Sequence, residues 1–113
     1  MEMPLIDEPS YQHLADRTFK RIEDALKDVD ADDVDVERSG DVVTLTFKGN
    51  KRCVLNTQRP TRQIWLAANS RAWHFSYDSA RDVWIDDKQP GVELFATVED
   101  VVKQGAGVAI KVA

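Results

Sequence analysis

Apolar residues recur at spacings of three and four along residues 11–29, which is the pattern of an amphipathic helix with one buried face. Pro9 and Ser10 suit its first turn, with Ser10 as the candidate N-cap residue. The predicted buried face consists of Tyr11, Leu14, Ala15, Thr18, Ile22, Ala25, Leu26 and Val29. A second helix is predicted after Pro90 and Gly91, ending at Gly105 or Gly107. Its apolar face comprises Leu94, Val98, Val101 and Val102.

Six short segments between these helices have the alternating, β-branched character of strands. They are residues 34–38, 42–48, 52–57, 62–67, 72–77 and 82–86. Turn residues separate them, including the hairpin signal Gly49-Asn50, and such short links favour an antiparallel meander. We therefore expect an α+β two-layer sandwich in which two helices cover one face of a roughly six-stranded antiparallel sheet. The other sheet face is expected to meet water.

Strand periodicity predicts which side chains lie on that open face. In residues 62–67, Ile64 and Leu66 are expected to face the helices, so their neighbours face water. In residues 82–86, alternation does not decide whether Trp84 or the pair Val83 and Ile85 faces the helices. The outward set includes Asn56, Gln63, Trp65 and His74. A tryptophan among amides on a wet face indicates a binding surface, although a partly covered sheet tryptophan is the alternative.

Composition narrows the classes of function. The chain has 113 residues, which suits one domain over residues 1–113, and its 20 acidic against 15 basic residues give a net charge of -5. Such a charge disfavours nucleic acid and anionic lipid as partners. A lone cysteine, Cys53, rules out an intramolecular disulfide and a paired-cysteine metal site. Residues 1–9 resemble no targeting signal and no stretch is long and apolar enough to span a membrane, so a cytoplasmic protein is expected.

Acidic residues gather between the end of the first predicted helix and the first predicted strand. Asp16, Glu23 and Asp30 recur every seven residues and so share one flank. The set, here called the acidic ridge, is Asp16, Glu23, Asp24, Asp28, Asp30, Asp32, Asp33, Asp35 and Glu37. Oxygen ligands alone suit Ca, Mg, Mn or Fe rather than tightly held zinc. The alternative is a solvated face that only keeps the protein soluble, and composition alone slightly favours it.

The remaining candidates for chemistry are few. Neither His13 nor His74 has a second histidine at ligand spacing, and His74 is the better candidate of the two. Cys53 lies in an apolar strand without a readable base partner, so an inert core cysteine is expected. The sequence contains no glycine-rich phosphate loop and no recognisable Ser-His-Asp arrangement, so we expect a protein that is not an enzyme.

Residues 56–67 read NTQRPTRQIWLA and resemble the frataxin signature Asn-x-Gln-x-Pro-x-x-Gln-Ile/Val-Trp-Leu-Ala/Ser. Further similarities lie along nearly the whole chain, including residues 14–16, residues 43–47, Trp84 and residues 104–107. The resemblance is to the bacterial, CyaY-type branch of the family. It implies a frataxin-like fold, iron binding by the acidic ridge, and association with the cysteine desulfurase and scaffold protein of iron–sulfur cluster assembly.

The resemblance assigns roles to residues of this chain. Weak, exchangeable binding of Fe2+ or Fe3+ is assigned to the acidic ridge. Contact with the partner proteins is assigned to what we call the Trp65 surface, namely Asn56, Gln58, Gln63, Trp65 and His74. The preferred interpretation is a regulator or adaptor of the desulfurase. Without iron, the protein is expected to be a monomer. The alternatives are an iron store or ferroxidase, or a protein-interaction module without a physiological metal. The sequence leaves open whether iron drives oligomers.

Overall fold

The first helix, α1 (Glu8–Leu26), begins one turn earlier than its periodicity predicts. In the computed structural model, which describes residues 6–112, Asp7 is the N-cap and its carboxylate accepts a hydrogen bond from the Ser10 amide at 2.9 Å. The prediction of Ser10 as N-cap is therefore wrong, because Pro9 already lies inside the first turn, where its missing amide proton costs nothing. The helix also ends at Leu26, three residues before the predicted end.

Six strands follow in an antiparallel meander, as predicted, and each boundary lies within one residue of its predicted place. They are β1 (Val34–Ser39), β2 (Val42–Phe47), β3 (Arg52–Gln58), β4 (Gln63–Ala68), β5 (Arg71–Asp78) and β6 (Val83–Asp86). Every strand pairs only with its neighbours in the chain, so the sheet order is β1-β2-β3-β4-β5-β6. A single 3₁₀ turn, η1 (Lys48–Asn50), joins β2 to β3, and Gly49 takes the left-handed φ of 79° that glycine adopts without strain.

The second helix, α2 (Leu94–Ala106), ends where Gly107 adopts a left-handed φ of 68°. Gly105, the other predicted end of the helix, is not the cap. It lies inside α2 against the ring of Phe47, and a Cβ at this position would approach that ring to 2.6 Å. Its lack of a side chain therefore lets α2 pack closely on β2.

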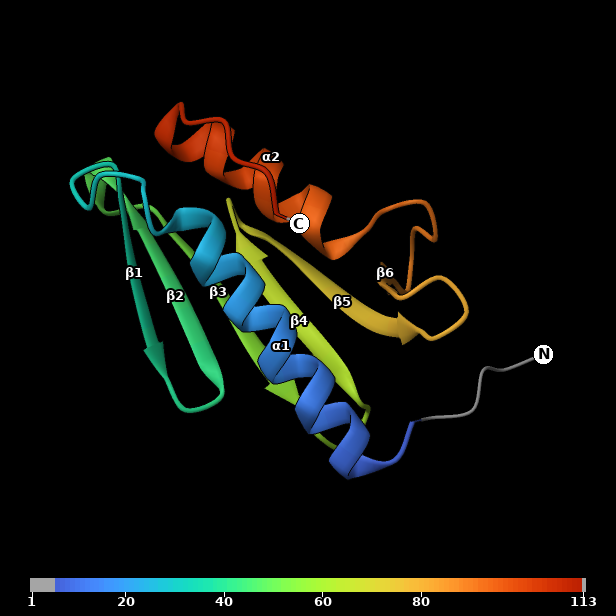
Figure 1. Ribbon diagram of the computed structural model, residues 1–113. Helices are drawn as coiled ribbons and strands as arrows, with labels where there is room; N and C mark the ends of the chain where they lie inside the picture. The colour runs from blue at the N-terminus through green and yellow to red at the C-terminus, as the bar shows by residue number, and fades with distance from the viewer. Residues whose placement is uncertain (1–5, 113) are drawn as a thin grey trace.

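Both helices cover one face of the sheet, and the core lies between the two layers (Figure 1). The predicted inward residues Ile64 and Leu66 are 0% and 1% exposed. Trp84, which the alternation left undecided, points inward, and its indole nitrogen donates to the Thr18 hydroxyl at 2.9 Å. The α+β two-layer sandwich is confirmed. The ends of the domain predicted over residues 1–113, namely residues 1–5 and 113, lie outside the described part of the chain.

Two smaller findings complete the fold. Residues 108–112 alternate weakly in sequence but form no strand; they run back along α2 (Figure 1), and the Val112 amide donates to Glu99 Oε2 at 2.9 Å. Within residues 6–112, neither helix combines the length and the apolar composition needed to cross a membrane.

Candidate functional site

The Trp65 surface occupies the sheet face that the helices leave uncovered. Antiparallel register places Trp65 directly opposite Asn56 on β3 and His74 on β5, and it places Gln63 opposite Gln58 on β3. Because directly opposed side chains lie on the same face, all five predicted residues form one patch. The structure therefore brings together every residue that the sequence assigned to this surface.

Trp65 is fixed on this face by two contacts. Its ring stacks on His74, with the ring centroids 4.0 Å apart and the planes 15° from parallel. Its indole nitrogen donates a hydrogen bond to Gln63 Oε1 at 2.9 Å. Trp65 is half-buried rather than free in solvent, so the ring presents a fixed apolar face with its polar atom already satisfied.

Gln63 is the most enclosed member of the surface, with only 8% of its area exposed. Its amide nitrogen donates to the Ser76 hydroxyl at 3.1 Å and to the Asp87 carboxylate. The Ser76 hydroxyl in turn donates to Asp87 Oδ1 at 2.9 Å. Sequence reasoning missed both of these supporting residues. Ser76 lies two positions after His74, so strand alternation could have placed it on the same face. Asp87 comes after β6, where alternation no longer applies.

The connection between β3 and β4 is tied to the core by Tyr11. The hydroxyl of this fully buried side chain accepts from the Gln58 amide at 3.0 Å and donates to the Gln63 carbonyl at 2.6 Å. Burial raises the pKa of Tyr11 above its usual value. On the outer side of the same strand, Gln58 Nε2 donates to Asn56 Oδ1 at 3.0 Å. Helix α1 thus holds both ends of the link that carries Gln58 and Gln63.

The acidic ridge runs along one flank of α1, through the following turn and into β1. Asp16 and Glu23 lie on the same flank, as their spacing predicts, and both bind the guanidinium of Arg38. The Arg38–Glu23 contact measures 3.0 Å, and the Arg38 guanidinium also lies 5.5 Å from the centre of the Phe19 ring. Arg38 was not identified from the sequence, because no local pattern indicates that its guanidinium meets Asp16 and Glu23.

Other ridge acids are spread along the surface rather than gathered. Asp33 pairs with Lys48 at 3.2 Å, and Asp30 Oδ1 accepts from the Asp32 amide at 2.9 Å. Because α1 ends at Leu26, Asp28 lies beyond the helix and is not a helical i, i+4 neighbour of Asp24. Across residues 6–112, no three side chains of His, Cys, Asp or Glu come close enough together to hold a metal ion. The ridge offers hard oxygen donors, but it does not form a ready chelate.

Two further sequence candidates can be placed. His13 is exposed on α1, and Cys53 is 0% exposed within the core. Burial raises the pKa of the Cys53 thiol to about 12, so it stays protonated at neutral pH and is a poor nucleophile. The placement of Cys53 in the core is confirmed.

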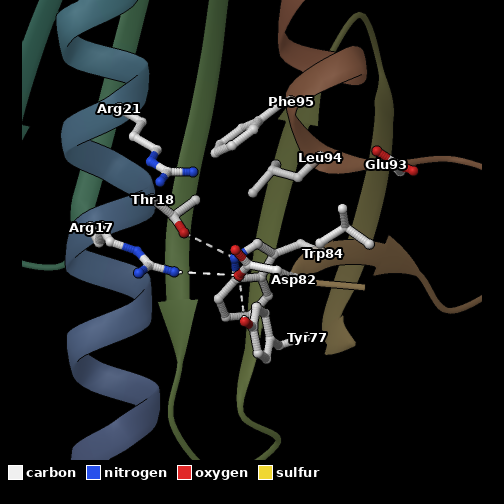
Figure 2. Close-up of a pocket in the computed structure, with 10 residues that line it drawn as sticks. Arg17, Thr18, Arg21, Tyr77, Asp82, Trp84, Glu93, Leu94 and Phe95 are labelled. Carbon is white, nitrogen blue, oxygen red and sulfur yellow. Dashed lines mark hydrogen bonds and ion pairs between the residues drawn. The ribbon is translucent and has the colours of Figure 1, made fainter. Parts of the chain in front are cut away.

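A separate pocket lies between α1, the β5–β6 link and the start of α2 (Figure 2). Arg17 reaches across it to Asp82 at 3.3 Å, and the Tyr77 hydroxyl donates to the same carboxylate. This hydrogen bond raises the pKa of Tyr77. Figure 2 also shows the Thr18–Trp84 hydrogen bond at the pocket wall. These contacts fasten β6 to α1, and none of the residues predicted as functional lines the pocket.

Comparison with known proteins gives concordant results. The frataxin-like domain matches residues 4–108. The iron–sulfur cluster assembly protein CyaY of Pseudomonas fluorescens is 37% identical over 102 residues, covering 90% of this chain and 91% of the relative. The protein of the same name from Cupriavidus pinatubonensis is 37% identical over 112 residues, covering 96% of this chain and 98% of the relative.

Two solved frataxin structures share the fold of this chain. Frataxin from Psychromonas ingrahamii superposes with a TM-score of 0.86 at 24% identity, covering 96% of this chain and 99% of that structure. Trimeric yeast frataxin complexed with ferrous iron gives a TM-score of 0.62 at 23% identity, covering 96% of this chain and 92% of that structure. With its sequence motif, its sandwich architecture and these relatives in agreement, the chain belongs to the frataxin-like family.

Proposed function

We propose that the protein acts in iron–sulfur cluster assembly as an iron-binding regulator or adaptor of the cysteine desulfurase and its scaffold protein, without catalysis of its own. The names of its sequence relatives support the assembly role. The observation that carries the regulator proposal is the Trp65 surface, where five predicted contact residues form one continuous patch. The proposed unit is a single domain over residues 1–113 that is monomeric without iron.

Trp65 is the proposed anchor for the partner protein. A tryptophan held in place among polar groups is the usual form of an interface hot spot, because binding removes a large apolar face from water. The stack on His74 and the hydrogen bond to Gln63 fix the ring before the partner arrives. Binding then loses little side-chain freedom.

The acidic ridge is proposed to attract the partner's basic groups and to hold iron weakly. Within the described chain, the ridge acids that form no ion pair are Asp24, Asp28, Asp30, Asp32, Asp35 and Glu37. Carboxylates suit iron chemically, and their spread positions fit a hydrated, exchangeable ion rather than a chelated one. The same spread also favours a second candidate, a protein-interaction module that has no physiological metal.

Binding of the cognate desulfurase tests the proposed surface. Trp65→Ala is expected to weaken binding by about 2 kcal/mol or more, which is roughly 30-fold in Kd, mainly through faster dissociation. Lys103→Ala is the matched control, because Lys103 is exposed on α2, in the layer on the opposite side of the sheet. Surface plasmon resonance would measure both variants. Parent-like binding by Trp65→Ala would refute the assignment of this surface.

Iron titration separates the two candidate functions. Anaerobic Fe(II), added while amide NMR signals are followed, should move the signals of the acidic ridge and raise the melting temperature, since a bound cation relieves like-charge repulsion. Replacement of Asp24, Asp28 and Asp35 by Asn should reduce both effects. The interaction module would be favoured if neither the ridge signals nor the melting temperature responded to iron. Sedimentation of the iron-loaded protein would show whether iron drives oligomers.

A further inference from the structure

The hydrogen bonds behind Trp65 end at one carboxylate, that of Asp87. The indole nitrogen of Trp65 donates to Gln63 Oε1, and Gln63 Nε2 donates to both Ser76 and Asp87. The Ser76 hydroxyl then donates its own proton to Asp87. Asp87 therefore accepts from both polar side chains that stand behind the indole. It lies just past β6, outside the set of residues assigned to partner contact.

A carboxylate at this end of the network determines which way the Gln63 amide points. An ionised carboxylate can only accept hydrogen bonds, so it must face the amide nitrogen of Gln63 and not its oxygen. The amide oxygen is then left facing the indole nitrogen, which can only donate. Without Asp87, the amide could rotate by half a turn and place two donors, Gln63 Nε2 and the Trp65 indole, against each other.

The backbone around Asp87 keeps the carboxylate in place. The Asp87 amide donates to the His74 carbonyl at 2.9 Å, so Asp87 is joined to the strand that carries the stacking partner of Trp65. The neighbouring Asp86 side chain is 6% exposed and accepts from the His74 amide at 3.2 Å and the Gln89 amide at 3.1 Å. The residue at the end of this chain of bonds is thus held by the sheet and not by a loose loop.

We propose that Asp87 is a positioning residue for the partner-binding surface: its carboxylate orients the Gln63 amide, and that amide fixes the ring of Trp65 in its binding position. Asp87 acts through Gln63 and forms no direct hydrogen bond with Trp65. The part of this inference that concerns binding rests on the proposed function of Trp65 as the partner anchor. The part that concerns ring position stands on the hydrogen bonds alone.

Indole NMR signals provide a direct test in the whole protein. The chain has three tryptophans, so a nitrogen–proton spectrum shows three indole signals, and Trp65→Phe identifies the one from Trp65. In Asp87→Ala, the Trp65 signal should shift and its proton should exchange faster with water. Asp87→Asn should give a smaller shift than Asp87→Ala, because the Asn oxygen can still accept from Gln63, although the Asn amide nitrogen no longer excludes the rotated Gln63 amide. Both variants lose the same charge, so the contrast between them isolates orientation from electrostatics.

The Trp84 indole serves as an internal control, because its bond to Thr18 lies in the core, on the helix-covered side of the sheet. Its signal should stay in place in both variants, which shows that any change at Trp65 is not loss of the fold. A Trp65 signal at its parent position in Asp87→Ala would overturn the proposal. So would an Asp87→Asn spectrum that matches that of Asp87→Ala.

Binding to the cysteine desulfurase provides the second readout. Asp87→Ala should raise Kd by about three- to tenfold, the effect expected when one side chain must be immobilised on binding, and Asp87→Asn should raise Kd by less. Equal binding by the Ala and Asn variants, with a larger indole shift in the former, would overturn the link to binding. If Trp65→Ala itself binds like the parent, the proposed surface fails instead, and the NMR result alone decides the role of Asp87.

Discussion

The two predicted functional regions differ in how their polar groups are satisfied. On the Trp65 surface, side chains bond to one another, and the network reaches from the indole to Asp87. On the acidic ridge, carboxylates outnumber their partners, and Arg38 and Lys48 are the cations that pair with them in the described chain. A surface of the first kind presents a fixed shape, whereas one of the second kind presents charge. The difference suits the first to specificity and the second to long-range attraction.

Two neighbouring residues of β4 give the sharpest test of the first region. Leu66→Ala should lower the free energy of unfolding by about 2–5 kcal/mol. The Leu66 side chain is only 1% exposed, so its truncation leaves a cavity in the core. Trp65→Ala should lower it by about 1 kcal/mol or less, mainly through the lost stack on His74. Urea denaturation of both variants would measure the contrast. If Trp65→Ala unfolds the protein, the outer face is structural.

Tyr11 connects the Trp65 surface to the core, so removal of its hydroxyl should lower the free energy of unfolding more than removal of an exposed hydroxyl would. Tyr11→Phe should cost about 1–3 kcal/mol, because the Gln58 amide and the Gln63 carbonyl lose their buried partner. The raised pKa of Tyr11 means that the folded state holds this proton more firmly than the unfolded state does. Its contribution is therefore complete below about pH 10 and is lost as pH rises through the folded pKa.

Urea denaturation at several pH values would check this sign. The stability difference between the parent and Tyr11→Phe should be largest near neutral pH and should shrink above about pH 10. Cys53, whose pKa is also raised by burial, is present in both proteins and cancels in the difference. A difference that grows with pH would contradict the assignment.

Arg38 tests the second region, because it neutralises two of the ridge acids. Arg38→Gln should lower stability by about 0.5–1 kcal/mol, as expected for ion pairs at a partly exposed site. The same change should increase affinity for Fe(II) or Mn(II), since Asp16 and Glu23 lose their internal cation. Arg59→Gln, which removes an exposed pair with Asp41 at 3.5 Å, is the control and should leave metal affinity unchanged. Calorimetric titration would detect the difference.

The smallest effect concerns charge at the end of α1. Asp24 lies in the last turn, which has no basic residue, so its carboxylate opposes the helix dipole. Asp24→Asn should raise the free energy of unfolding by about 0.3–1 kcal/mol, and added salt should reduce that gain. Asp100→Asn, in the middle of α2, should change stability by less. Thermal melting at low and high salt would show whether the ridge is strained.

Sequence patterns predicted the strands better than the helix ends or the supporting residues. One face of the sheet is buried, so alternation predicted the strand positions and the side of β4 on which Trp65 lies. Trp84 stayed undecided because its neighbours Val83 and Ile85 are also apolar, and only the Thr18 hydroxyl shows why the indole points inward. Arg38 and Asp87 act on residues distant in the chain, and no local pattern indicates which carboxylate or amide they meet.

The order of the strands has a consequence for folding. Each strand pairs with the next one along the chain, so every sheet contact closes a short loop and can form as the chain is made. Helix α1 is different, because its Thr18 meets Trp84, 66 residues later. Because α1 precedes all six strands in the chain, its contact with Trp84 can form only after β6 has been made. Closing the Thr18–Trp84 contact therefore costs more chain entropy than pairing two neighbouring strands.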